Sequence, residues 1–377
     1  MSLRMLALDQ NRSIRVVEFA THWFRECNMS RRVEKGTIAI SFVFEALEVM
    51  RRRGLDCEHL LVRAGISPEL LNLPHARVSA NHYGKLWHLI ADTLDDEFFG
   101  MDSHGMKKGS FTLLCHSVIH ADTLGRALHR ALRFLRVVLD DIGAELVRDG
   151  ELARITVMER MTDHTSAQVL PPQRAFAYGT FLLIVHGLAC WLVGRRIPLL
   201  SADFRCAEPS FSGEWRVLFL PQLQFNQPHT EISFSAKYLD MGTIQTERTM
   251  KQFLRNAPAN FLVKYKNSAS LTAQIRRRLR EVPPMAWPDC ETLARQFHTS
   301  QSTFRRRLDK EGQSYRAILD DLRRDLAISL LSNSDKPIAD IAAELGFTEA
   351  STFYRAFRKW TGARPSEYRF SGIAPPH

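Results

Sequence analysis

The pattern Ser-Thr-Phe-x-Arg-x-Leu/Phe occurs twice near the end of this 377-residue chain, at 302–308 and at 351–357. Each copy follows a short amphipathic segment. The stretches 291–312 and 339–362 are therefore similar throughout, with a turn one residue longer in the second. Two short helices joined by a tight turn, the second exposed and cationic, form a helix-turn-helix unit. The repeat predicts two such units.

The second copy contains the signals that favour its helix. Phe353, Phe357 and Trp360 recur at positions i, i+4 and i+7, so they share one apolar face. Gly362 is placed to end the helix, because glycine readily adopts the left-handed conformation found at helix C-termini. The arginines and lysines between the aromatic residues then face outward.

A further helix is predicted between the two units, in 314–331. About 17 helical residues span ~26 Å. A rod of that length could hold two recognition helices about one DNA turn apart, ~34 Å, so that both enter successive major grooves. The apolar residues expected on one face of this helix are Tyr315, Ile318, Leu319, Leu322, Leu326 and Leu330.

The composition agrees with a polyanionic partner. Hydrophobic residues make up 45% of the chain, as in a folded globular protein, and the formal net charge is +10. Residues 258–370 hold 20 lysines and arginines against 13 acidic residues, so less than a third of the chain carries +7 of that charge. This balance favours nucleic acid, although other basic proteins share it.

The segment 346–369, GFTEASTFYRAFRKWTGARPSEYR, resembles the signature of the AraC/XylS family of bacterial transcription regulators. The resemblance covers roughly 258–370, and the first unit is similar to a subgroup that includes the ornithine-utilisation regulator. It implies an α+β fold. A mixed α/β effector domain of the arabinose-operon-regulator type would precede an all-α domain with two helix-turn-helix units joined by a linker helix.

The resemblance also implies roles for individual residues. Arginine suits bidentate contact with guanine, whereas phosphate contacts position a protein without specifying sequence. For each residue alone, a solvated helix face is the alternative. The positions expected at base edges or phosphates are Ser302, Arg305, Arg306, Glu349, Ala350, Ser351, Tyr354 and Arg355. Those expected to hold phosphates are Ser300, Thr303, Thr352 and Lys359.

The chain divides into four expected segments. They are a poorly ordered stretch at 1–36, an effector-binding and dimerisation domain at 37–243, a linker at 244–257 and the DNA-binding domain at 258–371. In the second segment, helices are predicted at 37–53, 59–71 (broken at Gly65), 79–94, 111–120 and 123–139. Asp149-Gly150 suits a hairpin turn, and strand-like runs follow Pro198, which together indicate a modest antiparallel sheet. No strand is expected in the last 110 residues.

The run 176–194 contains no Asp, Glu, Lys or Arg and is long enough to span a bilayer. It also contains three glycines, a histidine, a threonine and a tyrosine. A buried core or interface helix is therefore the preferred interpretation, and a membrane segment is the alternative.

Other chemistry is weakly signalled. His116 and His120 have helical HxxxH spacing, but no third metal ligand is evident, so no metal or other cofactor is expected. The six cysteines are scattered, and GxSxG, P-loop and GxGxxG motifs are absent, so no enzyme is expected. Cations near apolar positions could hold an effector carboxylate, with a plain surface role as the alternative. These effector candidates are Lys107, Lys108, His116, His120 and Arg133.

Together these features predict a cytoplasmic regulator that binds double-stranded promoter DNA, senses a small metabolite, contacts RNA polymerase and activates transcription. Homodimerisation through the N-terminal domain is a further expectation. Two alternatives stay open. One is a ligand-independent regulator controlled by its abundance or by a protein partner, and the other is an architectural protein that binds DNA without sequence preference.

Overall fold

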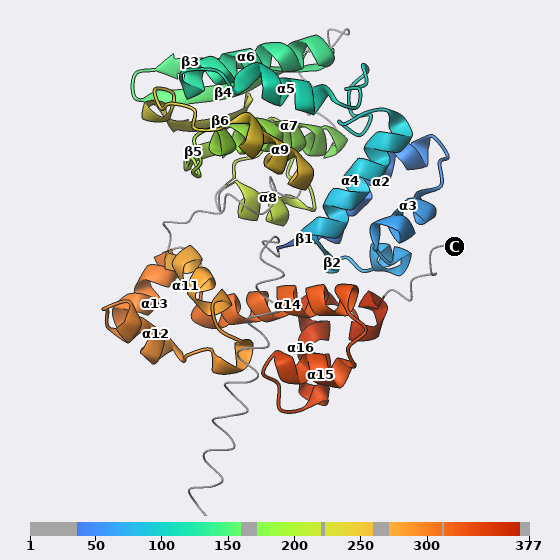
Figure 1. Ribbon diagram of the computed structural model, residues 1–377, viewed down its shortest axis with the longest axis vertical. Coiled ribbons are helices and arrows are strands. Elements are labelled where there is room, and N and C mark those ends of the chain that lie inside the picture. Colours follow the sequence, from blue (N-terminus) through green and yellow to red (C-terminus); the bar gives the residue numbers. More distant parts are fainter. Residues whose placement is uncertain (1–35, 160–171, 220–222, 259–270, 311–312, 370–377) are drawn as a thin grey trace, which may run out of the picture. The chain divides into compact units, whose positions relative to one another are not determined.

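The computed structural model describes residues 36–159, 172–219, 223–258, 271–310 and 313–369. They form two compact units (Figure 1). One unit, here called the N-terminal unit, contains residues 36–258 and 361–369, and the C-terminal unit contains residues 271–360. The segment 1–36, expected to be poorly ordered, lies outside the described residues except for Gly36.

The N-terminal unit contains a four-stranded antiparallel sheet in the order β3-β4-β6-β5. β3 and β4 form the expected hairpin, and Gly150 takes the positive φ of 56° that its turn requires. The run after Pro221 makes only a single bridge, between Asp203 and Gln224, so the strand expected there is wrong. The strands are β3 (Ile142–Asp149), β4 (Leu152–Glu159), β5 (Leu199–Asp203) and β6 (Thr230–Ser235).

A second, two-stranded sheet was not expected from the sequence. β1 (Thr37–Ala39) pairs with β2 (Arg77–Ser79), so the helix predicted from residue 37 begins only at Ile40. Ser79 caps the following helix by accepting a hydrogen bond from the His82 amide at 3.1 Å. Each strand has only three residues, too few for a period-2 pattern to be recognised.

Helices surround the sheet, and their positions confirm those predicted at 59–71, 79–94, 111–120 and 123–139. Gly65 breaks the first of these, 59–71, with a φ of 80°. The helices are α2 (Ile40–Arg52), α3 (Cys57–Ala64), η1 (Pro68–Asn72), α4 (Ala80–Leu94), α5 (Ser110–Val118), α6 (Leu124–Val138), α7 (Pro172–Leu192), α8 (Ser212–Leu218), η2 (Ala236–Tyr238) and α9 (Glu247–Asn256).

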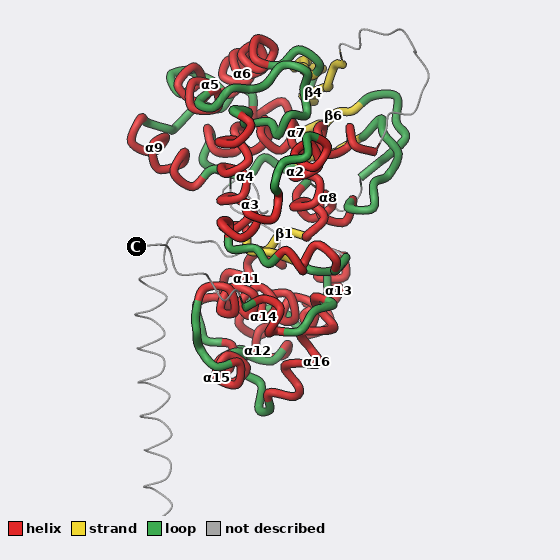
Figure 2. The backbone as a smooth tube through the Cα atoms, turned by 90° about the vertical axis from the view of Figure 1, so that its right-hand side faces the viewer, coloured by secondary structure: helices red, strands yellow, loops and turns green. Residues whose placement is uncertain are grey.

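α7 is the apolar helix that could have been a membrane segment. Arg174–Leu192 is long and apolar enough to cross a membrane, and its most apolar stretch is wholly buried inside the N-terminal unit (Figure 2). Gly179 lets Trp215 pack against this helix, because a Cβ at that position would overlap the indole ring. The structure therefore supports the core-helix interpretation.

The segment 244–257, expected as a linker, is a packed part of the N-terminal unit. It contains α9, in which Met250 and Phe253 are buried. The Phe253 ring stacks on Trp191 of α7 with centroids 4.3 Å apart and an interplanar angle of 9°. The many polar residues of this segment indicated a linker, although its few apolar side chains are enough to pack it against α7.

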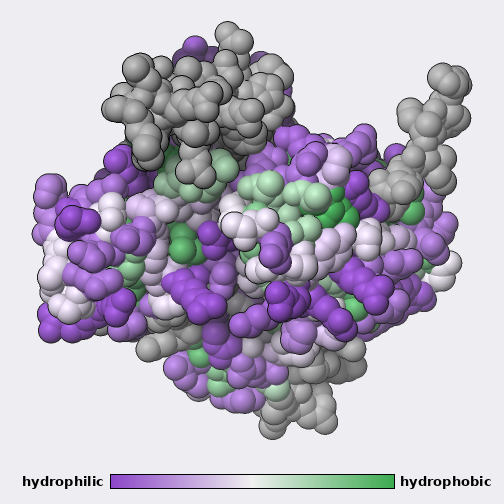
Figure 3. Space-filling view, turned by 90° about the horizontal axis from the view of Figure 1, so that it is seen from below, coloured by the Kyte–Doolittle hydropathy of each residue, from purple (hydrophilic) through white to green (hydrophobic). Residues whose placement is uncertain are grey.

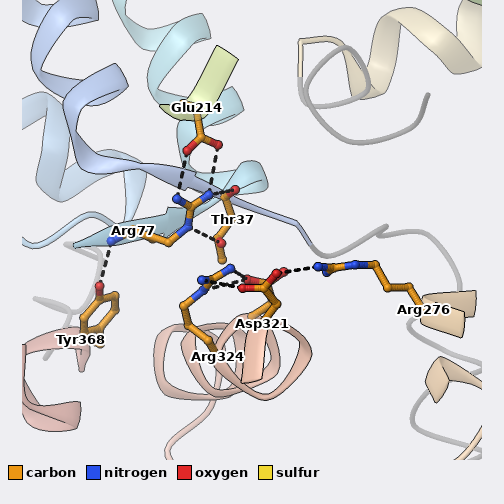
Figure 4. A network of polar contacts seen from close by, with 8 residues as sticks. Thr37, Arg77, Glu214, Arg276, Asp321, Arg324 and Tyr368 are labelled. Carbon is orange, nitrogen blue, oxygen red and sulfur yellow. Dashed lines mark hydrogen bonds and ion pairs between the residues drawn. The ribbon is translucent and has the colours of Figure 1, made fainter. Parts of the chain in front are cut away.

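A polar network ties together distant parts of the N-terminal unit (Figure 4). The Arg77 guanidinium donates two hydrogen bonds to the Glu214 carboxylate, at 2.9 and 3.0 Å, and one from Nε to the Thr37 hydroxyl at 2.9 Å. The backbone amide of Arg77 donates to the Tyr368 hydroxyl at 2.9 Å. This hydrogen bond joins the 361–369 segment to β2 of the same unit.

The C-terminal unit is helical, and no strand occurs among its described residues, as predicted. In α14 the buried face agrees with expectation at Ile318 and Leu322 but then changes: Leu326 and Leu330 are half-buried, and Ile328 is fully buried. The helices are α11 (Leu271–Arg280), η3 (Pro284–Ala286), α12 (Cys290–Gln296), α13 (Gln301–Lys310), α14 (Tyr315–Asn333), α15 (Ile338–Glu344) and α16 (Ala350–Thr361).

The two ends of α14 pack against different neighbours, which explains this change. Its first half contributes to a core built with α11, α12 and α13, while α15 packs against α14 as well. A helix with different partners along its length must turn different side chains inward. A single apolar stripe, as the sequence suggested, would serve only one partner.

Candidate nucleic-acid interface

The first helix-turn-helix unit consists of α12 and α13. Asp289 caps α12, because its carboxylate accepts a hydrogen bond from the Thr292 amide at 2.7 Å. Ser300 caps α13 in the same way by accepting from the Thr303 amide at 3.3 Å. His298 lies between the helices with a φ of 52°, which reverses the chain in a short turn. Local sequence chemistry therefore sets both helix starts.

α13 is anchored by its apolar side. Phe304 and Leu308 are fully buried, and Phe297 from the preceding turn packs on Phe304 with ring centroids 5.9 Å apart. Burying each such aromatic or aliphatic side chain contributes about 1.5–3 kcal/mol to the free energy of folding. The outward face of α13 can therefore be entirely polar. The buried core residues of this unit are Leu271, Ile275, Leu279, Leu293, Ala294, Phe304, Leu308, Ile318 and Leu322.

The second unit, α15 and α16, repeats this construction. Gly346 adopts a φ of 83° in the turn, and Phe347 packs beside Phe353 at 5.5 Å. Phe353 and Phe357 are fully buried, as their spacing predicted. Gly362 has a φ of 74° directly after the helix, which confirms that it ends α16.

The residues expected to contact DNA lie on the outward faces of α13 and α16 and in the turns before them. None is buried, and only Thr303 and Ala350 are half-buried. The exposed ones are Ser300, Ser302, Arg305, Arg306, Glu349, Ser351, Thr352, Tyr354, Arg355 and Lys359. Whether each of them contacts DNA stays a prediction.

The two recognition helices present the same pair of side chains at the same place. Ser302 and Arg306 are four residues apart on α13, as are Ser351 and Arg355 on α16, and all four are exposed. With 3.6 residues per turn, positions i and i+4 share one face. In each helix this face lies opposite the buried phenylalanine.

The helices differ one turn further on. Asp309 on α13 occupies the place that Arg358 has on α16, and both side chains are exposed. A carboxylate there repels a phosphate backbone, whereas a guanidinium attracts it. The second unit therefore offers the more cationic face.

Sequence reasoning assigned no DNA contact to Arg307 or Arg358, although the structure exposes both on recognition helices. Arg358 follows Arg355 by three residues and so extends the same face. Aligning the two copies helix by helix gives this signal directly. Arg307 flanks the face, next to the buried Leu308.

α14 is fastened to the first unit by an ion-pair chain (Figure 4). Arg276 of α11 pairs with Asp321 of α14 at 2.5 Å, and the other oxygen of Asp321 pairs with Arg324 at 2.9 Å. Arg324 also contacts the buried carboxylate of Asp325 at 3.2 Å. These ion pairs are partly shielded from water, so they restrain α14 more than an exposed ion pair would.

Arg323 connects the two helix-turn-helix units of the C-terminal unit through side-chain packing. Its guanidinium lies 5.4 Å from the Trp287 ring centre and 5.6 Å from that of Phe347, and its Nε donates to the Leu345 carbonyl at 3.2 Å. Trp287 precedes α12, whereas Leu345 and Phe347 form the turn of the second unit. One arginine on α14 thus contacts both helix-turn-helix units.

The surface drawn in Figure 3 is mostly hydrophilic, with small apolar patches between the polar side chains. In the described part of the C-terminal unit, the large apolar side chains that are exposed are Met285 and Tyr354. A polar, cationic recognition surface suits contact with a phosphate backbone better than contact with another apolar surface.

The five effector candidates lie on or beside α5 and α6. Lys107 and Lys108 precede α5, His116 lies on α5, His120 follows it and Arg133 lies on α6, and all five side chains are exposed. Lys108 pairs with Asp92 at 2.5 Å. Their role as effector contacts stays a prediction.

His116 and His120 do not form a helical HxxxH pair, because α5 ends at Val118 and His120 lies in the following turn. Among the described residues there is no group of three or more histidine, cysteine or acidic side chains placed to hold a metal ion.

The cysteines in the described residues are all free thiols. Burial raises the pKa of Cys115 to about 12 and that of Cys190 and Cys206 to about 11. These thiols stay protonated at neutral pH, which suits a structural role better than a nucleophilic one. Cys27 lies outside the described residues.

The protein is therefore a transcription regulator with a helix-turn-helix DNA-binding domain. The profile described as "Arabinose-binding domain of AraC transcription regulator, N-term" matches residues 54–242, and a "Helix-turn-helix domain" profile matches residues 293–370. The chain belongs to the AraC family of transcription regulators. It is a regulator and not an enzyme, like the relatives that it resembles.

One such relative is the ornithine utilization regulator of Pseudomonas aeruginosa, with 28% identity over 88% of this chain and 96% of that protein. Another is the HTH-type transcriptional regulator VqsM of the same species, 42% identical over 23% of this chain and 27% of that protein. Among solved structures, the transcriptional regulator CdpR of P. aeruginosa aligns with 87% of this chain and 98% of its own, at 20% identity and a TM-score of 0.29.

Proposed function

We propose that this protein activates transcription from promoters containing two half-elements about one DNA turn apart, and that a small metabolite bound by the N-terminal unit controls this activity. The main supporting observation is the repeated exposed pair, Ser302 with Arg306 and Ser351 with Arg355. Two equivalent reading faces on one chain are matched by two half-elements in DNA.

In this proposal Arg306 and Arg355 each read a guanine, because the guanidinium fork matches guanine O6 and N7 in the major groove. Ser300, Thr303, Thr352 and Lys359 hold phosphates and fix the register. α14 has 19 residues and is therefore ~28 Å long, close to the ~34 Å between successive major grooves.

The effector part of the proposal rests on the N-terminal profile match, since an arabinose-binding-type domain is a ligand-binding domain. A ligand can switch the protein only by binding two states with different affinity. The name of the P. aeruginosa relative makes ornithine the first effector to test. Homodimerisation, contact with RNA polymerase and a cytoplasmic location belong to the same proposal.

The test is selection of genomic DNA fragments by the purified full-length protein at about physiological salt, followed by footprinting with and without metabolite extract. Fragments sharing two half-elements about 10 base pairs apart would support two-unit reading. Recovery without sequence preference in both conditions would favour an architectural protein. A specific footprint that the extract never alters would favour a ligand-independent regulator.

A further inference from the structure

A cavity of about 450 Å³ opens at one end of the sheet in the N-terminal unit. It lies between the end of β4, the start of β6, helix α7 and the loop after β5, all within the N-terminal unit. Its volume falls within the ~300–1,000 Å³ range of small-molecule sites in proteins. The lining residues used here are Glu159, Tyr178, Arg205, His229 and Thr230.

The cavity is lined by two buried polar groups that make no hydrogen bond within the described residues. The Tyr178 side chain is 1% exposed, and its hydroxyl makes no hydrogen bond in the described part of the chain. Oε1 of Glu159 is likewise buried without a hydrogen bond, and the Glu159 side chain is 10% exposed. A buried polar group without a hydrogen bond destabilises the folded state, so a ligand that bonded to both groups would stabilise the protein.

The lining around these two groups also has an excess of negative charge. Among the described residues, the cation paired with Glu159 is Arg174, which lies 3.6 Å from Glu159 but also 3.8 Å from Asp141, so one guanidinium serves two carboxylates. Burial, and then the Glu159 carboxylate, raise the pKa of Tyr178 far above its usual value, so its phenol keeps its proton. This part of the cavity therefore favours a ligand group that is cationic and donates hydrogen bonds.

The opposite charge is found on a different element. Arg205 is half-buried in the loop after β5, and its side chain makes no hydrogen bond or ion pair within the described residues. Its backbone amide donates to the Thr230 hydroxyl at 3.0 Å, which holds the loop against the start of β6. His229 lies beside it and is exposed. A free guanidinium in a fixed loop suits a carboxylate.

We propose that this cavity binds a small amino acid, with the carboxylate on Arg205 and the ammonium group on Glu159 and Tyr178. The inference deepens the proposed function, on which it rests, by giving its effector a site and a chemical class. A neutral sugar would leave both charges unpaired, and a fatty acid would place an apolar tail against the Glu159 carboxylate. Neither matches a carboxylate and a guanidinium that line the same cavity.

Isothermal titration of the full-length protein tests this inference. The probes are the common L-amino acids and L-ornithine, with two analogues of ornithine: putrescine lacks the carboxylate, and 5-aminovalerate lacks the α-amino group. We expect saturable binding of at least one amino acid and at least tenfold weaker binding of its analogue without a carboxylate. If none of the amino acids binds, the ligand class is wrong.

Variants locate the site. Arg205→Ala and Tyr178→Phe should each weaken binding at least tenfold, while Arg136→Ala, at an exposed arginine of α6, should bind as the unchanged protein does. Tyr178→Phe preserves the packed ring, and a thermal melt of each variant identifies any that fail to fold. Unchanged affinity in both folded cavity variants would overturn the site.

These outcomes are separate from the test of the proposed function. If metabolite extract alters the footprint but no amino acid binds, effector control stands and the inferred ligand class falls. If amino acids bind in this cavity but never change DNA occupancy, the site stands and effector control by this ligand falls.

Discussion

The guanidinium of Arg323 lies 5.4 Å from the centre of the Trp287 ring. The same group lies 5.6 Å from the Phe347 ring, so it contacts one aromatic side chain that packs on the core of the first helix-turn-helix unit and another in the turn of the second. Cation–π contacts contribute about 0.5–2 kcal/mol each, depending on how far they are removed from water. We conclude that Arg323 helps to fix the spacing between the two helix-turn-helix units.

Replacing Arg323 by alanine should therefore weaken binding to DNA with two half-elements by about 1–2 kcal/mol, and leave binding to a single half-element nearly unchanged. The reason is that the variant removes the connection between the units but neither recognition face. Fluorescence anisotropy with both DNAs measures the difference. An equal loss on both would show that Arg323 acts through phosphate contact or through general stability.

The equivalence of Arg306 and Arg355 gives a second prediction. Each alanine variant should weaken specific binding by about 1–3 kcal/mol and relax one base position, with the two relaxed positions about 10 base pairs apart. Footprinting and selection of bound sequences measure both effects. The control is Arg130→Ala, an exposed arginine on α6 of the N-terminal unit. An unchanged sequence preference in the Arg355 variant would contradict its assignment to a base.

A third prediction follows from Asp309 and Arg358, which occupy equivalent positions with opposite charges. Asp309→Asn should strengthen binding to all sequences alike, and Arg358→Ala should weaken it alike, because phosphate contacts carry no sequence information. If Arg358 neutralises one phosphate, its loss should reduce the slope of log affinity against log salt by ~0.9. A change of sequence preference in either variant would show that the position reads bases.

His186 gives a prediction for pH. It is fully buried in α7, where Nε2 donates to the Ile197 carbonyl at 2.9 Å, and burial lowers its pKa to about 4. The unfolded chain takes up this proton near pH 6.5, and the folded protein only near pH 4. Stability should therefore fall as the pH drops from 6.5 to 4, by up to roughly 3 kcal/mol.

His186→Gln keeps a hydrogen-bond donor but cannot titrate, so it isolates this contribution. The melting temperature of the unchanged protein should drop more steeply between pH 6.5 and 4 than that of the variant. Above pH 7 the two curves should run parallel. Parallel curves over the whole range would mean that His186 does not control acid stability.

Some of the structure could be predicted because its cause is local. The repeated Ser-Thr-Phe pattern, the spacing of Phe353 and Phe357, and the left-handed glycines at 150 and 362 are each specified by a few neighbouring residues. The helix-turn-helix units and the hairpin follow from them. The outward placement of Arg306 and Arg355 follows as well, since a helix that buries one face must expose the other.

Other features depend on residues far apart in the sequence. The pairing of β1 with β2 joins strands about 40 residues apart, and the packing of α9 on α7 depends on a ring contact between Trp191 and Phe253. No local pattern in the sequence indicates that these segments will pair or pack with each other. The effector candidates near α5 have exposed side chains, and the described lining of the cavity does not include them.

The sequence by itself determined the class of protein, because an amphipathic helix with a cationic face and a capped turn is encoded within about 20 residues. Only the tertiary structure decided where a ligand could bind. It brought Glu159, Tyr178 and Arg205 to one cavity from three separate elements, and it left the Tyr178 hydroxyl and Glu159 Oε1 buried without a hydrogen bond in the described part of the chain. Burial and charge balance arise from the whole fold, so no local pattern could have revealed them.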